Sequence, residues 1–293
     1  MKDYLVRMMA ADGTVRAFAA TTKELAEEAR RIHKTSPVAT AALGRLLTAG
    51  VMMGVQLKDE KDLLTLAIRG DGSLGGVTVT ADMHGRVKGF VNHPDVWIAP
   101  KYAGKLDVGK AVGAGTLTVT RDQAYGQPYS SQVNLQTGEI GDDLAAYFVL
   151  SEQLPSSVGL GVLVDQDGEG GFLVKRAGGF LIQVMPGCTE ETISALEKNL
   201  TRLPSVTAAL DEGKTPEDLL GILLDGLSPQ EEGRDELSYY CNCSRERVSR
   251  VLLSLGKKEL EDMIKEQKPV ELCCHFCGKK YAFSVEEIQG LLE

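Results

Sequence analysis

The sequence has few histidines, no excess of positive charge and no apolar run long enough to cross a membrane. Lysine and arginine number 32 against 41 aspartates and glutamates, which gives a net charge of −9 with neutral histidine. We do not expect an acidic chain of this kind to bind nucleic acid or an anionic membrane. The longest uncharged apolar stretch, residues 46–57, has 12 residues, whereas a transmembrane helix needs roughly 18.

The first residues also lack the features of an export signal. Asp3 and Arg7 precede any apolar segment of the length found in a signal peptide. We therefore expect a cytoplasmic protein in a reducing compartment. Structural disulfides are rare there, so clustered cysteines indicate a metal site or redox chemistry first.

Residues suited to acid–base catalysis are sparse. His33, His84 and His93 are scattered and form neither a metal-binding nor a catalytic-triad pattern. Residues 70–75 match GxGxxG, but a predicted strand follows where a dinucleotide-binding motif requires a helix. Residues 208–215 resemble a P-loop but lack its first glycine and carry two acidic residues. The sequence therefore predicts no catalytic residues and no nucleotide or organic cofactor site.

Residues 1–187 contain short alternating runs that are typical of strands. The predicted strands are 4–9, 14–19, 63–69, 76–82, 86–91, 115–120, 130–136, 159–164, 171–175 and 179–184. Asp-Gly pairs at 12–13, 71–72 and 167–168 predict hairpins. Helices are predicted at 23–34, opened by a capping box of Thr21 and Glu24, and at 36–57. We predict an α+β core domain, 1–187, whose antiparallel sheets are covered by helices.

Residues 188–235 are predicted to form a helical, acidic linker. They contain 11 carboxylates and 4 basic residues, so −7 of the net charge of −9 lies in this segment. Residues 215–218 are typical of a helix start, with a threonine N-cap, proline at the first position and acidic residues in the first turn. The segment ends in the polar stretch 228–235, which we predict to be a hinge.

The remaining residues, 236–293, are predicted to form a small C-terminal domain. Ser244 is expected to cap a helix that ends at 255, and 257–266 to form a second helix. Residues 272–283 predict two strands joined by a tight turn, and Ser284 with Glu287 is expected to cap a final helix.

Five of the six cysteines lie in this C-terminal domain, within the 37 residues from 241 to 277. Cys241-x-Cys243 and Cys274-x-x-Cys277 form two short hooks, and four thiolates suit one tetrahedral zinc ion. Cys273 gives a different spacing, and its side chain is expected to leave the opposite face of its strand. The sequence therefore predicts a zinc site of Cys241, Cys243, Cys274 and Cys277.

Two kinds of chemistry are open to such a site. A domain of this size has little core, so metal binding, worth about 10–16 kcal/mol in small zinc modules, would dominate its folding. Peroxide oxidises a thiolate to a sulfenic acid, which a neighbouring thiol converts to a disulfide. The site is therefore either purely structural or an oxidant switch. A thioredoxin-like motif is disfavoured because residues 274–277 lead into a predicted strand.

The cysteine-containing segments resemble a known family. The segments CNCSRERV, LGKKELEDMI and CHFCGKKYAF, at 241–248, 255–264 and 274–283, resemble the redox-regulated chaperones of the 33 kDa heat-shock chaperonin (HslO) family. Residues 36–50, 70–76, 138–157 and 177–187 resemble core segments of the same family. The resemblance covers essentially the whole chain.

The resemblance implies a client-binding core, a helical linker and a zinc switch. In the reduced, inactive state one zinc ion occupies the four cysteines. Oxidation forms the disulfides Cys241–Cys243 and Cys274–Cys277, releases zinc and unfolds the switch and the linker. The oxidised protein, often a homodimer, is then an ATP-independent holdase that binds unfolded or oxidatively damaged client proteins and prevents their aggregation. The alternative is a zinc-ribbon adaptor, whose constitutive structural zinc gives no gain of activity on oxidation.

Two cysteines lie outside the family's pattern. Cys273 could form a competing bond with Cys277 or crosslink two chains. Cys188, at the boundary between core and linker, is expected to be a bystander; the alternative is that it is oxidised once the linker opens.

Overall fold

The computed structural model describes residues 2–102, 104–203 and 205–292. The chain divides into two compact units, residues 1–239 and 240–293. The first unit contains two sheets and the helices that cover them, and the second contains the clustered cysteines.

The first sheet has five antiparallel strands in the order β10-β1-β2-β9-β8. Its strands are β1 (Tyr4–Ala10), β2 (Val15–Thr21), β8 (Ser156–Gln166), β9 (Phe172–Val184) and β10 (Gln230–Glu236). The second sheet has the order β11-β5-β4-β3-β6-β7 and is antiparallel except for the β11–β5 pair. Its strands are β3 (Leu63–Gly70), β4 (Val77–Ala81), β5 (Arg86–Val91), β6 (Gly115–Asp122), β7 (Tyr129–Asn134) and β11 (Ser238–Tyr239).

Helix α2 (Pro37–Gly54) forms the centre of this unit. It packs against strands of both sheets, and nearly all of its side chains are buried. When its single charged residue, Arg45, is allowed, α2 is the one helix in the described chain that is long and apolar enough to cross a membrane, but 89% of that window is buried inside the protein. Helix α2 is therefore a core helix.

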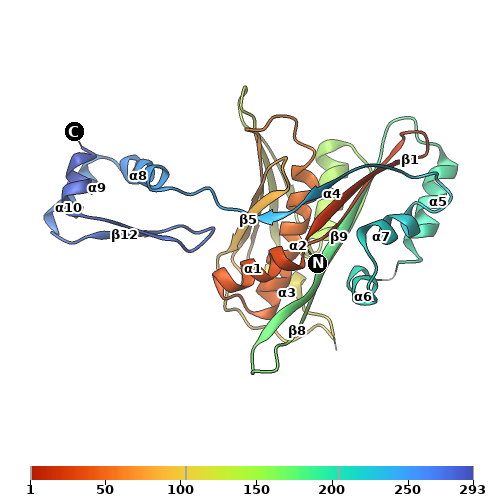
Figure 1. Cartoon of the computed structure of the whole chain (residues 1–293), viewed down its shortest axis with the longest axis horizontal. Helices are drawn as coiled ribbons and strands as arrows, with labels where there is room; N and C mark the ends of the chain where they lie inside the picture. The colour runs from red at the N-terminus through yellow and green to blue at the C-terminus, as the bar shows by residue number, and fades with distance from the viewer. Residues whose placement is uncertain (1, 103, 204, 293) are drawn as a thin grey trace. The chain divides into compact units, whose positions relative to one another are not determined.

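Both faces of the first sheet are covered. Side chains of β1 and β2 alternate between two apolar clusters, with Leu5 and Phe18 in one and Val6 and Ala17 in the other. Helices α1 (Lys23–His33) and α2 lie on one face, and α5 (Glu190–Leu200), α6 (Val206–Asp211) and α7 (Pro216–Leu223) lie on the other (Figure 1). The predicted linker helices thus bury an apolar surface of the sheet.

The predicted α+β class and the three Asp-Gly hairpins are confirmed. The runs at 171–175 and 179–184 are one strand, β9, because the glycines between them continue the pairing with β2. Helices α3 (Val108–Val112) and α4 (Gly141–Glu152) were not predicted. In α4, acidic and apolar residues do not alternate with a clear helical period, so it gave no sequence signal.

The predicted capping box of α1 is wrong. Thr21 belongs to β2, and the N-cap residue Thr22 makes no capping hydrogen bond. The amide of Leu25 instead donates to the buried carboxylate of Asp3 at 2.8 Å. A residue distant in sequence therefore caps this helix.

The predicted hinge at 228–235 is also wrong. Residues 230–236 form strand β10, which pairs with β1 and places Asp235 within 3.1 Å of Arg7. Five of its seven residues are charged, which suits an outer strand because its side chains are largely solvated. Because β10 has no alternating apolar residues, the sequence did not predict it as a strand.

The second unit consists of three helices and one two-stranded sheet, as predicted. Its elements are α8 (Arg245–Ser254), α9 (Lys257–Lys265), β12 (Val270–Cys273), β13 (Lys280–Phe283) and α10 (Val285–Gly290). Ser244 and Ser284 cap α8 and α10, which confirms both predicted caps. Among residues 240–292, the core contains five buried apolar side chains: Leu252, Leu260, Tyr281, Phe283 and Ile288.

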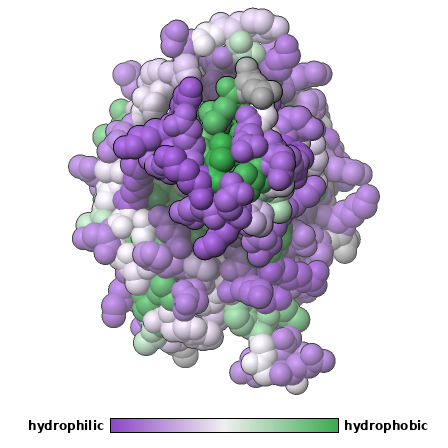
Figure 2. Space-filling view, turned by 90° about the vertical axis from the view of Figure 1, so that its left-hand side faces the viewer, coloured by the Kyte–Doolittle hydropathy of each residue, from purple (hydrophilic) through white to green (hydrophobic). Residues whose placement is uncertain are grey.

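Much of the surface is hydrophilic. Figure 2 shows one face, on which hydrophilic side chains surround a narrow hydrophobic strip. Within the second unit, the exposed large apolar side chains are Tyr240, Val251, Leu253 and Leu255. The charged surroundings favour solubility.

Candidate metal centre

Four cysteine sulfurs meet in the second unit. The Sγ atoms of Cys241, Cys243, Cys274 and Cys277 all lie within 4.8 Å of one another. The Cys241–Cys274 distance is 3.7 Å and the Cys243–Cys277 distance is 3.4 Å. Tetrahedral zinc with Zn–S bonds of about 2.3 Å requires sulfurs about 3.8 Å apart. The spacing therefore fits one zinc ion with four thiolate ligands.

Two tight backbone segments place these sulfurs. Cys241 and Cys243 immediately precede α8, whose N-cap is Ser244. Cys274 and Cys277 lie in the turn between β12 and β13. In that turn Gly278 has a φ of +68° and its amide donates to the Cys274 carbonyl at 2.8 Å. Glycine adopts this left-handed conformation without steric cost, so the turn can close around the sulfurs.

The other two cysteines lie outside the group. Cys273 is the last residue of β12, is exposed, and its Sγ lies 3.4 Å from the carbonyl oxygen of Gly278. Cys188 belongs to the first unit and packs against the apolar cluster under the linker helices.

A tyrosine that the sequence analysis did not identify contacts the cluster. The hydroxyl of Tyr281 donates a hydrogen bond to Cys243 Sγ at 3.1 Å, and the ring belongs to the core of the unit. Burial raises the pKa of Cys243, but hydrogen bonds from Tyr281 and the other thiols outweigh burial and lower the pKa to about 7. The alternation of β13 was the available signal, because it places Tyr281 and Phe283 on the same inward face.

The thiols of Cys241 and Cys277 resist ionisation. Burial and hydrogen bonds to neighbouring cysteines raise the pKa of Cys241 and of Cys277. Four thiolates this close repel one another, so a cation is needed to hold them all deprotonated. The donor set, soft sulfur from four cysteines, is the one that zinc prefers in closed structural sites.

Two basic residues beside the hooks, Arg245 and Lys280, pair with carboxylates. Arg245 pairs with Glu287 at 2.6 Å and lies over the ring of Phe283, and Lys280 pairs with Glu271 at 2.7 Å. These cations therefore stabilise the fold of the unit.

Comparison with known proteins identifies the family. The family model described as "Hsp33 protein" matches residues 3–284. The chain belongs to the Hsp33 family. It is 50% identical to the 33 kDa chaperonin of Agathobacter rectalis over 99% of this chain and 100% of that protein. The identity to the 33 kDa chaperonin of Clostridioides difficile is 47%, over 100% and 99% of the two chains.

A solved Hsp33 structure shares the fold. The crystal structure of the 33 kDa chaperonin (heat shock protein 33 homolog) from Thermotoga maritima matches with a TM-score of 0.90 and 38% identity. The match covers 100% of this chain and 98% of that one. The four-cysteine cluster is a zinc site typical of Hsp33 proteins, so the predicted zinc cofactor is confirmed. Membership of this chaperone family also agrees with the predictions of a cytoplasmic protein that is not an enzyme.

Proposed function

We propose that this Hsp33 protein is an ATP-independent holdase that oxidation activates. In this role it binds unfolded or oxidatively damaged proteins and prevents their aggregation. The observation that carries the proposal is the meeting of four sulfurs from two separate hooks in a unit with only five buried core side chains. Such a unit depends on its metal, and its ligands are oxidisable.

Cys241, Cys243, Cys274 and Cys277 are the proposed ligands. Zinc, when bound, supplies the positive charge that keeps these four sulfurs as thiolates. Each hook supplies two cysteines with one or two residues between them, so both hooks must be intact for four-coordinate binding.

Oxidation is proposed to form the disulfides Cys241–Cys243 and Cys274–Cys277. Peroxide converts one thiolate to a sulfenic acid and releases hydroxide, and the second thiolate displaces another hydroxide to form the disulfide. Two electrons pass from the sulfurs to each peroxide. In the folded unit, sulfur–sulfur contacts of 3.7 Å (Cys241–Cys274) and 3.4 Å (Cys243–Cys277) join the two hooks. Once the unit unfolds, the sulfurs of different hooks separate, whereas those of one hook stay close because the loop between them is short.

Each of three segments is proposed to have its own role. Residues 1–187 form the client-binding core, 188–235 the linker that opens, and 236–293 the redox switch. The linker buries Leu196, Leu219 and Leu223 against an apolar sheet face that includes Val6 and Ala17. Release of this segment would expose that face, and contiguous exposed apolar surface binds unfolded chains.

The oxidised protein is proposed to act as a homodimer, as its family resemblance implies. Sedimentation of the reduced and oxidised protein tests this, with a mass twice that of the 31.5 kDa chain expected after oxidation. A mass that stays monomeric in the active sample would exclude the dimer. Disulfide mapping of the same sample tests the pairing, since bonds to Cys273 or Cys188 would show that these thiols compete.

The function is tested by suppression of aggregation of a thermally unfolding client. The zinc-loaded protein is assayed before and after peroxide with mild heat, while a chromogenic chelator records zinc release. We expect protection to begin only as zinc leaves, and Cys188→Ser to behave as the wild type. Zinc release without protection would contradict the holdase and favour the zinc-ribbon adaptor.

A further inference from the structure

The outer strands of the sheets differ in how well they resist pairing with another chain. Residues 156–164 of β8 have the sequence SSVGLGVLV, without charge or proline. The opposite outer strand of the same sheet, β10, carries five charged residues. In the second sheet, the outer strand β7 has four polar residues besides Tyr129 and Val133. Charged outer strands discourage strand addition, whereas long apolar ones invite it. Among the longer outer strands of the described residues, β8 is therefore the one that neither charge nor proline protects over 156–164.

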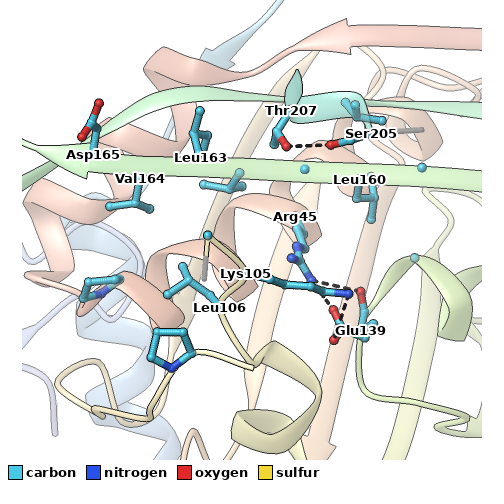
Figure 3. A pocket seen from close by; sticks show the side chains of 18 of the residues that line it. Arg45, Lys105, Leu106, Glu139, Leu160, Leu163, Val164, Asp165, Ser205 and Thr207 are labelled. Atoms are coloured by element: carbon cyan, nitrogen blue, oxygen red, sulfur yellow. Dashed lines mark hydrogen bonds and ion pairs between the residues drawn. The ribbon is translucent and has the colours of Figure 1, made fainter. Parts of the chain in front are cut away.

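A cavity runs along this edge. It has a volume of about 850 Å³ and follows β8 from Val158 to Gln166 (Figure 3). Leu160 and Val164 project to one side of the strand and Leu163 to the other, so an added strand would meet apolar side chains on both of its faces. Nine strand residues span about 30 Å, enough for a segment of similar length.

Charge limits what fits at one end of the cavity. Glu139 forms an ion pair with Arg45 at 2.8 Å and lies within 4 Å of Lys101 and Lys105. Asp142 also lines this end, so three cations face two carboxylates and leave a local excess of one positive charge. In the middle of the cavity, from Leu160 to Val164, β8 contributes no charged side chain. An extended apolar segment with an acidic residue at one end complements this arrangement.

The cavity is continuous with the surface that the linker covers. Ser205, Val206 and Thr207, at the start of α6, form part of its lining, and α6 packs on β8 and β9. This approach depends on Gly161, because a Cβ there would lie 2.6 Å from Thr207 Cγ2. Opening of residues 188–235 would therefore remove one wall of the cavity and give a long chain access to it.

We propose that the free edge of β8 is a docking site for extended, apolar segments of unfolded client proteins. A client segment pairs with the backbone of β8 as a sixth strand and places alternate side chains on its two sides. Recognition through the backbone requires no particular client sequence. This inference rests on the proposed holdase function and assigns its client-binding surface.

The test compares two labelled peptides on the oxidised full-length protein. Both have alternating valine and threonine with a terminal glutamate, but one carries N-methyl groups on alternate amides and cannot complete a ladder of hydrogen bonds. Fluorescence anisotropy is expected to show binding of the parent peptide and roughly tenfold weaker binding of the methylated one, because several hydrogen bonds are lost. Equal affinity would overturn strand addition.

A matched pair of variants locates the site. The double variant Leu163→Lys/Val164→Lys places charge on the β8 edge and is expected to weaken peptide binding roughly tenfold, by the loss of apolar contact and edge access. Glu232→Lys places the same side chain on the exposed edge of β10 and is expected to have no effect. Unchanged binding by the β8 variant would place the site elsewhere.

Crosslinking decides the outcome if the double variant does not fold. A photoreactive residue at exposed Asp165 is expected to capture the client in the oxidised protein, and one at Glu232 is not. Capture of a second copy of this chain at 165, or of nothing, would overturn the proposal. Failure of the oxidised wild type to suppress aggregation would instead overturn the holdase function itself, so the two failures are distinguishable.

Discussion

The two units of this protein are stabilised by different means. In residues 1–239, an almost completely buried helix, α2, lies against two sheets, and apolar packing supplies the stability. In residues 240–293, five buried side chains and four converging cysteines hold the fold. Hydrophobic packing is indifferent to oxidants, whereas thiolate ligation is destroyed by them. The contrast explains how one chain can keep a folded core while its C-terminal unit responds to redox conditions.

Zinc removal is expected to have the largest effect. A strong chelator, or Cys277→Ser, should unfold residues 240–292 and leave α2 and its sheets folded, because metal binding contributes about 10–16 kcal/mol to small zinc modules. Limited trypsin digestion measures this as rapid cleavage at Arg250 and Lys257. Cys188→Ser is the control and should remain resistant. Resistance of the Cys277→Ser variant would mean that packing alone holds the second unit.

Substitution in the apolar core should affect only the first unit. Leu46 is fully buried in α2, so Leu46→Ala should lower the unfolding free energy of this unit by about 2–5 kcal/mol. Urea denaturation followed by circular dichroism measures the change. Zinc affinity should stay at the wild-type value, whereas Leu252→Ala, in the core of the second unit, should weaken it. An equal loss of zinc affinity in both variants would show that the two units unfold together.

The first unit should also respond to pH through Asp3. Burial raises the pKa of Asp3 to about 7, from 3.8 in an unfolded chain. The folded state thus holds the proton more tightly, and the contribution of Asp3 to stability falls as pH rises from about 4 to 7. Asp3→Asn should remove this dependence and make the variant more stable than the wild type above pH 7, by about 4 kcal/mol.

Urea denaturation of both proteins at several pH values checks the Asp3 prediction. The difference in unfolding free energy between variant and wild type should grow with pH across this range. A difference that stays constant would show that Asp3 acts only as the cap of α1.

Tyr281→Phe should have the smallest effect, confined to the second unit. Phenylalanine preserves the buried ring but removes the hydrogen bond to Cys243, worth about 1 kcal/mol. Zinc release to a competing chelator should therefore be a few times faster, with the fold retained. Tyr4→Phe, which removes a hydroxyl that donates to Glu217 in the first unit, is the matched control and should leave the release rate unchanged. Equal rates in all three proteins would show that the hydroxyl does not support the metal centre.

The sequence predicted most of the fold because its local signals were strong. The Asp-Gly hairpins, the serine caps of α8 and α10 and the alternation of most strands all depend on neighbouring residues. Features that depend on distant residues were missed. Asp3, which lies just before β1, caps α1, and β10 is a strand because β1 lies beside it.

The candidate site was predicted as far as cysteine spacing allows. Spacing distinguished Cys274 from Cys273, and the structure brings Cys274 alone of these two into the group of four sulfurs. Spacing could not reveal the Tyr281 hydroxyl, because a hydrogen bond between β13 and the first hook exists only after folding. The cavity along β8 was equally inaccessible, since its walls come from segments more than 100 residues apart in sequence.

Oxidation is proposed to unfold the second unit and the linker while the core stays folded. The most direct test is hydrogen–deuterium exchange on the zinc-loaded full-length protein before and after peroxide with mild heat. The same samples are assayed for client protection. We predict that residues 240–292 and the linker helices α5, α6 and α7 lose protection from exchange, that α2 keeps it, and that client protection begins with this loss. Client protection that arises while the second unit and the linker helices stay protected would contradict the proposed mechanism.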